Sequence, residues 1–384
     1  MKGSEISVYV HIPFCVRKCL YCDFNSAVQP DYIIDSYINA LLTELDLKRE
    51  AFVSRQLVSV YIGGGTPSSI PPSYIRLILE RISSYIPIND DTEITIEINP
   101  GTTVDHKIGD YVACGINRIS IGLQSADDEE LKALGRIHDF ETFLHTYDVV
   151  SNAGIDNINV DIMTSIPHQN KESLVSTLKK VTGLKPQHIS AYSLIIEPGT
   201  PFYQRGAVNL DLPSEDESLE MDRKTREFLD AAGYKRYEIS NYAKKDEKRD
   251  FRCLHNLRYW DRGDYLGFGV SAASLYGNRR FTNIADIGPY ITSPGRQVSE
   301  DLLLSPDDAA AEFMFLGLRK TDGIRLLDFK EEFGTDIKRI YGHIMKKQVE
   351  KELAMFSGEG DEERFMLTDR GLEVSNIVMS EFLR

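Results

Sequence analysis

Three cysteines lie within eight residues near the start of the chain, Cys15, Cys19 and Cys22, with the spacing C-x3-C-x2-C. Three thiolates on one short loop can bind three irons of a cubic 4Fe–4S cluster and leave the fourth iron open to a small molecule. A structural zinc site is the alternative, but zinc needs a fourth nearby Cys or His and usually two paired C-x2-C turns. Because the next cysteine, Cys114, is far along the chain, the spacing predicts an iron–sulfur cluster.

Strand-like and helix-like segments alternate through residues 1–240. The strand-like segments are rich in Val, Ile and Tyr, as buried parallel strands are, and span residues 7–12, 58–62, 93–98, 118–123, 157–163, 188–194 and 234–239. The helix-like segments span residues 32–50, 74–85, 127–134, 140–153 and 171–184. This rhythm predicts right-handed βαβ units on a parallel sheet. We therefore expect an α/β fold in which residues 1–240 form a full or partial (β/α) TIM-type barrel.

Unusual residues stand where the predicted strands end. The cysteine loop follows the first strand, Gly63-Gly64-Gly65-Thr66-Pro67 follows the second, and Glu97-Ile98-Asn99-Pro100 closes the third. Gln124 ends the fourth strand and Asp161 lies near the end of the fifth. Because the carboxyl ends of parallel strands meet on one face of a barrel, we expect these residues to share a site. The glycine run is either a tight turn or a place where backbone groups approach a ligand closely.

The last part of the chain no longer alternates strand-like and helix-like segments. Residues 306–320, 326–334, 337–353 and 368–382 are predicted helices, and residues 354–367 are a predicted hairpin. We expect residues 241–300 to connect the barrel to a small C-terminal helical, winged-helix-like domain at residues 301–384. The hairpin tip is acidic, with Glu359, Asp361, Glu362 and Glu363, and the chain has a net charge of −15. This charge favours a packing or lid domain over nucleic-acid binding.

Taken together, the cysteine loop, the glycine turn, Glu97, Gln124 and Asp161 resemble the radical S-adenosylmethionine (SAM) superfamily, and more narrowly its coproporphyrinogen-dehydrogenase-like branch. The resemblance implies a 4Fe–4S cluster whose open iron binds SAM and passes one electron to its sulfonium. It also implies SAM-binding roles for Tyr9, Gly64, Gly65, Thr66, Glu97, Gln124, Arg136 and Asp161. Carboxylates and an amide can bind hydroxyl and ammonium groups, and Arg136 can pair with a carboxylate. Because the dehydrogenase branch has two SAM sites, these residues can serve one molecule or two.

A second motif, His255-Asn256-Leu257-Arg258-Tyr259-Trp260, resembles the HNxxYW motif of HemW-type heme chaperones. The resemblance implies heme bound at His255, Tyr259 and Trp260. An imidazole is a common axial ligand of heme iron, aromatic rings offer flat faces to a porphyrin, and Arg258 or Arg262 can meet a propionate. The alternative from the residues alone is a buried, hydrogen-bonded His–Asn turn beside aromatic packing. Cys253 is either a small buried residue or a further heme contact.

We therefore expect a heme chaperone that binds heme, a 4Fe–4S cluster and SAM, and delivers heme to an acceptor such as a respiratory enzyme at the membrane. One rival is an enzyme, oxygen-independent coproporphyrinogen III dehydrogenase, and another is an unassigned radical SAM enzyme that carries the motif. Two departures disfavour the dehydrogenase. Only fourteen residues precede Cys15, and Phe24 stands where that enzyme has a fourth cysteine.

Cysteine usage and hydropathy indicate the compartment. Clustered thiols in a large enzyme-like chain are typical of a reducing environment. The sequence contains neither an apolar leader at its start nor a run of the ~20 apolar residues that a membrane span needs. We therefore expect a cytoplasmic protein that is not an integral membrane protein.

Overall fold

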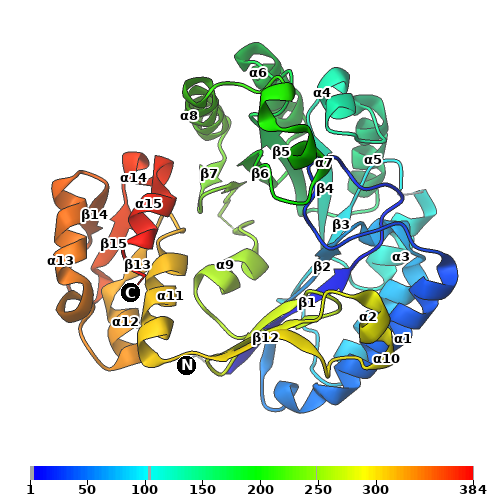
Figure 1. Cartoon of the computed structure of the whole chain (residues 1–384), viewed down its shortest axis with the longest axis horizontal. Coiled ribbons are helices and arrows are strands. Elements are labelled where there is room, and N and C mark those ends of the chain that lie inside the picture. Colours follow the sequence, from blue (N-terminus) through cyan, green and yellow to red (C-terminus); the bar gives the residue numbers. More distant parts are fainter. Residues whose placement is uncertain (1–3, 103–104, 248, 384) are drawn as a thin grey trace.

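The computed structural model describes residues 4–102, 105–247 and 249–383. Six consecutive parallel strands lie side by side in its main sheet: β1 (Glu5–Ile12), β2 (Gln56–Gly64), β3 (Glu93–Ile98), β4 (Arg118–Gln124), β5 (Ile158–Thr164) and β6 (His188–Ser193). The other neighbour of β1 is β9 and that of β6 is β8, so the six strands curve into a partial barrel that stays open (Figure 1). The prediction of an α/β fold with a partial barrel is confirmed.

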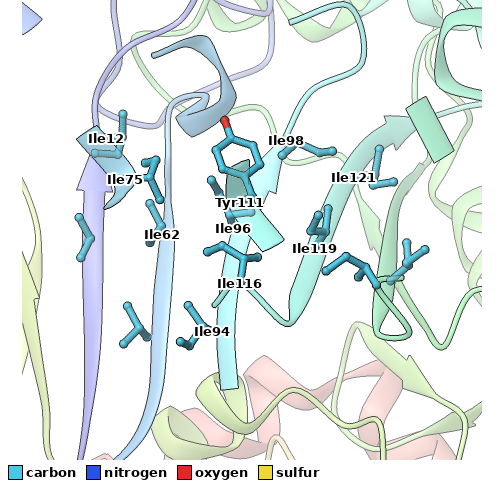
Figure 2. Packing of buried hydrophobic residues seen from close by; sticks show 14 of the residues in the cluster. Ile12, Ile62, Ile75, Ile94, Ile96, Ile98, Tyr111, Ile116, Ile119 and Ile121 are labelled. Carbon is cyan, nitrogen blue, oxygen red and sulfur yellow. The ribbon is translucent and has the colours of Figure 1, made fainter. Parts of the chain in front are cut away.

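Helices cover the outer face of these strands, because each parallel crossover packs back onto the sheet. They are α1 (Asp31–Leu47), α2 (Pro72–Ser83), α3 (Asp105–Ala113), α4 (Asp128–Ala133), α5 (Phe140–Asn152) and α6 (Lys171–Leu184). Ile94, Ile96 and Ile98 alternate along β3 and belong to one buried cluster with Ile75 of α2 and Tyr111 of α3 (Figure 2). The main hydrophobic core therefore lies between the strands and the helices.

The inner face of the same strands is polar, although the strand segments look almost wholly apolar in the sequence. Side chains alternate along a strand, so the residues between the core positions point inward. Toward the amino ends these inward residues are Ser7, Ser59, Glu93, Arg118, Asn159 and His188, and further along they are Tyr9, Tyr61, Glu97, Ser120, Asp161 and Tyr192. Because buried polar groups need partners, this face holds hydrogen-bond networks rather than a second apolar core.

The expected seventh parallel strand at residues 234–239 is wrong. The chain instead forms two short strands, β7 (Lys235–Arg236) and β8 (Asn241–Ala243), and β8 runs antiparallel to β6. The Glu238 carboxylate holds this reversal, because Ser240 N and Asn241 Nδ2 both donate to its Oε1 at 2.7 Å. Two helices precede the reversal, α7 (Pro201–Arg205) and α8 (Glu215–Ala231).

Residues 254–303 extend the sheet at its other edge. β9 (Tyr265–Phe268) runs parallel to β1, and β10 (Ala273–Tyr276), β11 (Arg279–Asn283) and β12 (Val298–Leu303) continue it as antiparallel strands. α10 (Ile287–Thr292) lies between β11 and β12. α9 (Leu254–Trp260), which carries the HNxxYW sequence, packs against β2 on the inner side of the partial barrel (Figure 1).

The C-terminal part forms a small unit with its own hydrophobic cluster, which includes Met314, Phe329, Tyr341 and Phe365. Its elements are α11 (Pro306–Gly317), β13 (Ile324–Arg325), α12 (Leu326–Phe333), α13 (Ile337–Glu350), β14 (Ala354–Ser357), β15 (Arg364–Leu367), α14 (Asp369–Glu373) and α15 (Ser375–Ser380). The hairpin expected at residues 354–367 is β14 and β15. The helix expected at residues 368–382 is two short helices, because Val374, with φ of −118°, leaves the helical range between them. Within the described ranges, every helix is too short or too polar for a membrane span.

Candidate functional site

The loop that carries the three cysteines covers a cavity of about 250 Å³ at the carboxyl ends of the parallel strands. Backbone hydrogen bonds hold the loop in place, from Cys15 N to Ala27 O and from Leu20 N to Leu134 O, both at 3.1 Å. Ten of the predicted site residues line the cavity: Cys15, Cys19, Cys22, Gly64, Gly65, Thr66, Glu97, Gln124, Arg136 and Asp161. The fold therefore brings the residues at the ends of five strands to one place.

The three cysteine thiols are free and partly exposed. Thr66 Oγ1 lies 3.5 Å from Cys15 Sγ, and Arg136 Nη1 donates to Cys19 Sγ at 3.5 Å. Burial raises the pKa of the Cys22 thiol. Among the described residues, no three His, Cys, Asp or Glu side chains are arranged to hold a single metal ion. A cubic 4Fe–4S cluster does not need ligands that converge on one ion, because each thiolate binds a separate iron.

The turn at Gly63–Gly65 packs directly against the cysteine loop. Gly65 N donates to Ile12 O at 2.8 Å. Gly64 has a φ of +108°, and a Cβ there would stand 2.5 Å from the His11 ring, while a Cβ on Gly65 would stand 2.7 Å from Phe14 O. Contacts within the protein are therefore enough to require glycine at these two positions.

Glu97 lies between the glycine turn and β2. Tyr61 Oη donates to its Oε1 at 2.8 Å and Gly64 N donates to its Oε2 at 3.2 Å. Burial raises the pKa of Glu97 to about 7, and the nearby Asp161 carboxylate adds to the rise. The cavity therefore contains a carboxyl group that can change its protonation state near neutral pH.

Tyr9 does not line this cavity. Its hydroxyl donates to His11 Nδ1 at 3.0 Å, since His11 Nε2 is already donating to Asn25 O at 2.8 Å. The Tyr9 ring borders a second cavity of about 380 Å³, together with Tyr259, Trp260, Tyr265, Ser271, Ala273, Leu275, Arg280 and Leu316. The rings of Tyr9 and Tyr61 lie 6.4 Å apart, and Tyr61 lines the first cavity. These two tyrosines therefore stand between the cysteine-lined cavity and the second one.

His255 lies in the first turn of α9 and is almost fully buried. Its Nδ1 lies 2.9 Å from Ser59 Oγ, and its Nε2 lies 2.8 Å from Tyr259 Oη. Ser59 precedes Tyr61 on β2, so His255 packs nearer the amino ends of the strands than the cysteine loop does. Burial lowers the pKa of His255 to about 3, with the Arg118 charge adding to the effect, so the imidazole is neutral at physiological pH.

The N-terminus of α9 is attached to β3 through Glu93. The Glu93 carboxylate accepts hydrogen bonds from Leu254 N and His255 N, both at 3.1 Å, and from Cys253 Sγ at 3.3 Å. Cys253 is wholly buried, and burial raises its pKa to about 12. Of the two alternatives for Cys253, the structure therefore has the small buried residue, and its thiol also donates a hydrogen bond to Glu93.

The two arginines expected near a propionate already have carboxylate partners. Arg258 Nη1 donates to Glu5 Oε2 at 2.9 Å. Arg262 donates to Glu312 at 3.2 Å and to Glu332 at 2.9 Å, and it is almost completely buried. Neither arginine is among the residues that border the cavity of about 380 Å³.

Comparison with known proteins decides the family. A model of the Radical SAM superfamily matches residues 9–181, and a model of the HemN C-terminal domain matches residues 304–374. The chain is 34% identical to the heme chaperone HemW of Lactococcus lactis, over 98% of this chain and 97% of that protein. It is 32% identical to the heme chaperone HemW of Bacillus subtilis, over 98% and 99% of the two chains. The chain belongs to the HemW family of the radical SAM superfamily.

Among solved structures, the fold of this HemW-family chain is shared with HemN. The coproporphyrinogen III oxidase HemN of Escherichia coli superimposes with a TM-score of 0.85, over 99% of this chain and 90% of that one, at 24% identity. At that identity the similarity describes the fold alone. It extends through the C-terminal unit, in agreement with the match to the HemN C-terminal domain.

Several side chains that border the two cavities were not singled out from the sequence, among them Tyr61, Tyr192 and Arg280. Asn99 joins two predicted residues, because its Nδ2 donates to Thr66 Oγ1 at 2.8 Å and its Oδ1 accepts from Arg136 Nη2 at 2.5 Å. Asn99 belongs to Glu97-Ile98-Asn99-Pro100, the segment directly after β3 that the sequence predicted to lie at the site. Tyr61 and Tyr192 occupy inward positions of their strands, which the alternation of apolar residues could have identified.

Proposed function

We propose that this chain is a heme chaperone that binds heme beside α9, holds a 4Fe–4S cluster and SAM under the cysteine loop, and transfers heme to an acceptor protein. The observation that carries the proposal is membership of the HemW family along almost the full chain, with both motifs bordering cavities. Relatives named heme chaperone HemW support the heme and transfer parts, and the superfamily supports the cluster and SAM.

The donor set of the first cavity supports a cluster with SAM. Three thiols border it, and metal binding favours the thiolate form even where burial opposes it, as at Cys22. Arg136 places positive charge beside Cys19, and its buried Nε has no hydrogen-bond partner among the described residues. A ligand carboxylate would satisfy that donor. When bound, such a cluster supplies single electrons and an open iron, while Glu97 and Asp161 offer acceptors for ammonium and hydroxyl groups.

The walls of the second cavity support a porphyrin. Tyr9, Tyr259, Tyr265, Leu275 and Leu316 give it apolar and aromatic surfaces. Arg280 also borders it, and its guanidinium is already paired with the Glu312 carboxylate at 2.9 and 3.1 Å, as Arg258 and Arg262 are with other carboxylates. Trp260 lines both this cavity and a larger one of about 870 Å³ beside the C-terminal unit, so the porphyrin site extends toward that unit.

We further propose a cytoplasmic location and acceptors among heme-dependent respiratory enzymes, including membrane-bound ones. The family resemblance supports this choice of acceptor. The net charge of −15 disfavours a nucleic-acid partner, because phosphate binding needs a basic surface.

Anaerobic heme transfer tests the proposal. The full chain, reconstituted with iron and sulfide and loaded with ferric heme, is mixed with a heme-depleted respiratory cytochrome, with and without SAM and reductant. We expect holocytochrome to form faster than it does from free heme. We expect Cys19→Ala to lose the visible absorption of the iron–sulfur centre together with the transfer. Cys114→Ala is the matched control, because Cys114 lines neither of the two proposed sites.

Two outcomes would contradict the proposal. Transfer no faster than from free heme would remove the chaperone function. Conversion of coproporphyrinogen III by the reduced protein with SAM would assign the chain to the dehydrogenase reaction instead, which the fold shared with HemN makes necessary to test.

A further inference from the structure

The two ring nitrogens of His255 are held differently. Ser59 Oγ donates its single hydrogen to Ser7 Oγ at 2.8 Å, so it accepts at 2.9 Å the hydrogen on Nδ1 of His255. Nδ1 therefore carries the ring hydrogen and Nε2 carries the lone pair. Tyr259 Oη donates to that lone pair at 2.8 Å. The nitrogen that is chemically able to bind a metal is thus covered by a phenol hydroxyl.

The two partners of His255 also differ in their surroundings. Ser7 and Ser59 are fully buried on β1 and β2. Tyr259, in contrast, borders the cavity of about 380 Å³, and its ring packs edge-on against Tyr265 with centroids 4.5 Å apart. His255 itself borders neither cavity, so a ligand in the second cavity can approach Nε2 where the Tyr259 side chain moves aside, whereas the Ser59 side is closed by the sheet.

We propose that Tyr259 is a displaceable cover on Nε2 of His255, the nitrogen that binds heme iron, and that Ser59 is the positioning residue that keeps this nitrogen free of hydrogen. This inference rests on the proposed heme-binding function. When heme is bound from the second cavity, Nε2 of His255 would be the ligand atom for its iron, and Tyr259 would give up its hydrogen bond to Nε2. The hydrogen of Tyr259 stays on its oxygen, the ring hydrogen of His255 stays on Nδ1 and is still donated to Ser59 Oγ, and no proton is transferred.

General metal chemistry supports this division of roles. Histidines that bind metals almost always donate their other ring hydrogen to a protein acceptor, which fixes the tautomer and the orientation of the ring. Ser59 fills that place, because its own hydrogen is already given to Ser7.

Heme binding to the full chain and its variants tests the inference. Stopped-flow absorbance at the Soret band follows ferric heme, and fluorescence follows iron-free protoporphyrin IX as the probe of the cavity alone. Tyr259→Phe keeps the ring and removes the hydroxyl, so ferric heme should bind about fivefold more tightly, which corresponds to about 1 kcal/mol for one hydrogen bond that need not be broken. Protoporphyrin IX should bind equally to the wild type and to Tyr259→Phe, because it has no iron.

Two further variants complete the design. Ser59→Ala should lower the fraction of ferric heme with an imidazole-type low-spin spectrum, because the Nε2–H tautomer becomes available to His255. Tyr234→Phe is the matched control, since its hydroxyl is also buried but donates to Pro186 O at 2.7 Å, away from the second cavity. It should leave the binding of both porphyrins unchanged.

The outcomes separate this inference from the proposed function. If the wild type binds neither porphyrin, the heme site and the inference both fail. If ferric heme binds equally to the wild type and to Tyr259→Phe, with an unchanged spectrum in Ser59→Ala, heme binding stands and the inference is overturned. An equal gain for both porphyrins in Tyr259→Phe would also overturn it, because the effect would then arise from the cavity rather than from iron.

Discussion

The protonation state of the Glu97 carboxyl depends on what is bound in the cysteine-lined cavity. Burial of this carboxyl group raises its pKa to about 7 even though Tyr61 and Gly64 donate hydrogen bonds to it. Carboxyl groups that titrate near neutral pH are typical of functional sites. A ligand that brings positive charge into the cavity would favour the ionised form. Binding of such a ligand is therefore coupled to release of a proton from Glu97.

The substitution Glu97→Gln should change how stability depends on pH. The folded pKa of about 7 lies above the ordinary value of 4.5, so the folded protein holds this proton more tightly than the unfolded chain does. The contribution of the protonated Glu97 to the free energy of unfolding is therefore complete below about pH 4.5, and it is lost as the pH rises through about 7. The free energy of unfolding of the wild type should fall by about 3 kcal/mol relative to Glu97→Gln between these limits.

Denaturant unfolding at several pH values measures this difference. Glu129→Gln is the control, because Glu129 is exposed and pairs with Lys132 on the surface of α4. Its stability should follow the wild type at every pH. If Glu97→Gln also followed the wild type throughout, the buried carboxyl would not be the titrating group.

At the scale of elements, α9 depends on the sheet. A helix of seven residues is far below the ~12–15 residues at which isolated helices become marginally stable. The first N–H groups of a helix have no acceptor within the helix. In α9, the Glu93 carboxylate of β3 accepts hydrogen bonds from the N–H groups of Leu254 and His255, and it brings negative charge to the N-terminus. The position of the HNxxYW motif therefore depends on Glu93, a residue of the inner face of the barrel.

Glu93→Gln should loosen α9. The amide offers one acceptor in place of two and no charge, so we expect a loss of about 1–3 kcal/mol in the free energy of unfolding. Hydrogen exchange of residues 254–260 should become faster than in the wild type. Asp139→Asn is the control, because Asp139 caps the exposed start of α5 and asparagine caps equally well. Unchanged exchange in Glu93→Gln would show that α9 is held by other contacts.

The elements that could be predicted from the sequence are those with a local pattern. Most strands of the partial barrel are rich in β-branched residues, and most outer helices show an apolar stripe. Helix α8 was missed because it buries only Met221, Thr225 and Leu229, about one residue per turn in an otherwise charged segment. The reversal after β7 depends on the side chain of Glu238, and a propensity pattern carries no sign of it.

The same contrast applies to the candidate site. The residues around the cysteine loop could be predicted to meet because parallel strands end on one side of the sheet. The placement of α9 could not, because it depends on Glu93 and Ser59, which lie far back in the sequence. Tyr9 shows that a position on a strand does not by itself decide which cavity a side chain borders. Its side chain points inward from β1 and borders the second cavity instead of the cysteine-lined one.

At the scale of the whole molecule, the C-terminal unit lies on the open side of the partial barrel, with α9 between them (Figure 1). Arg262, just after α9, reaches into this unit and forms ion pairs with Glu312 of α11 and Glu332 of α12. Only 4% of the Arg262 side chain is exposed, against 21% and 15% for the two carboxylates. A second link is more exposed, from Arg223 of α8 to Glu373 of α14, with 48% of the arginine side chain exposed. Burial therefore distinguishes two arginines that span the same two parts of the chain.

Replacing these arginines should have unequal effects. Arg262→Gln removes a buried positive charge that pairs with Glu312 and Glu332, so we expect a loss of about 3 kcal/mol. Arg223→Gln should cost less than about 1 kcal/mol, because the arginine is exposed and Arg226 remains beside Glu373. Denaturant unfolding measures the free energies, and limited proteolysis between residues 241 and 305 reports whether the C-terminal unit separates. Adding Glu332→Gln to Arg262→Gln should recover part of the loss, because it removes a negative charge that the arginine no longer balances. A double variant no more stable than Arg262→Gln alone would mean that the arginine acts by packing rather than by its charge.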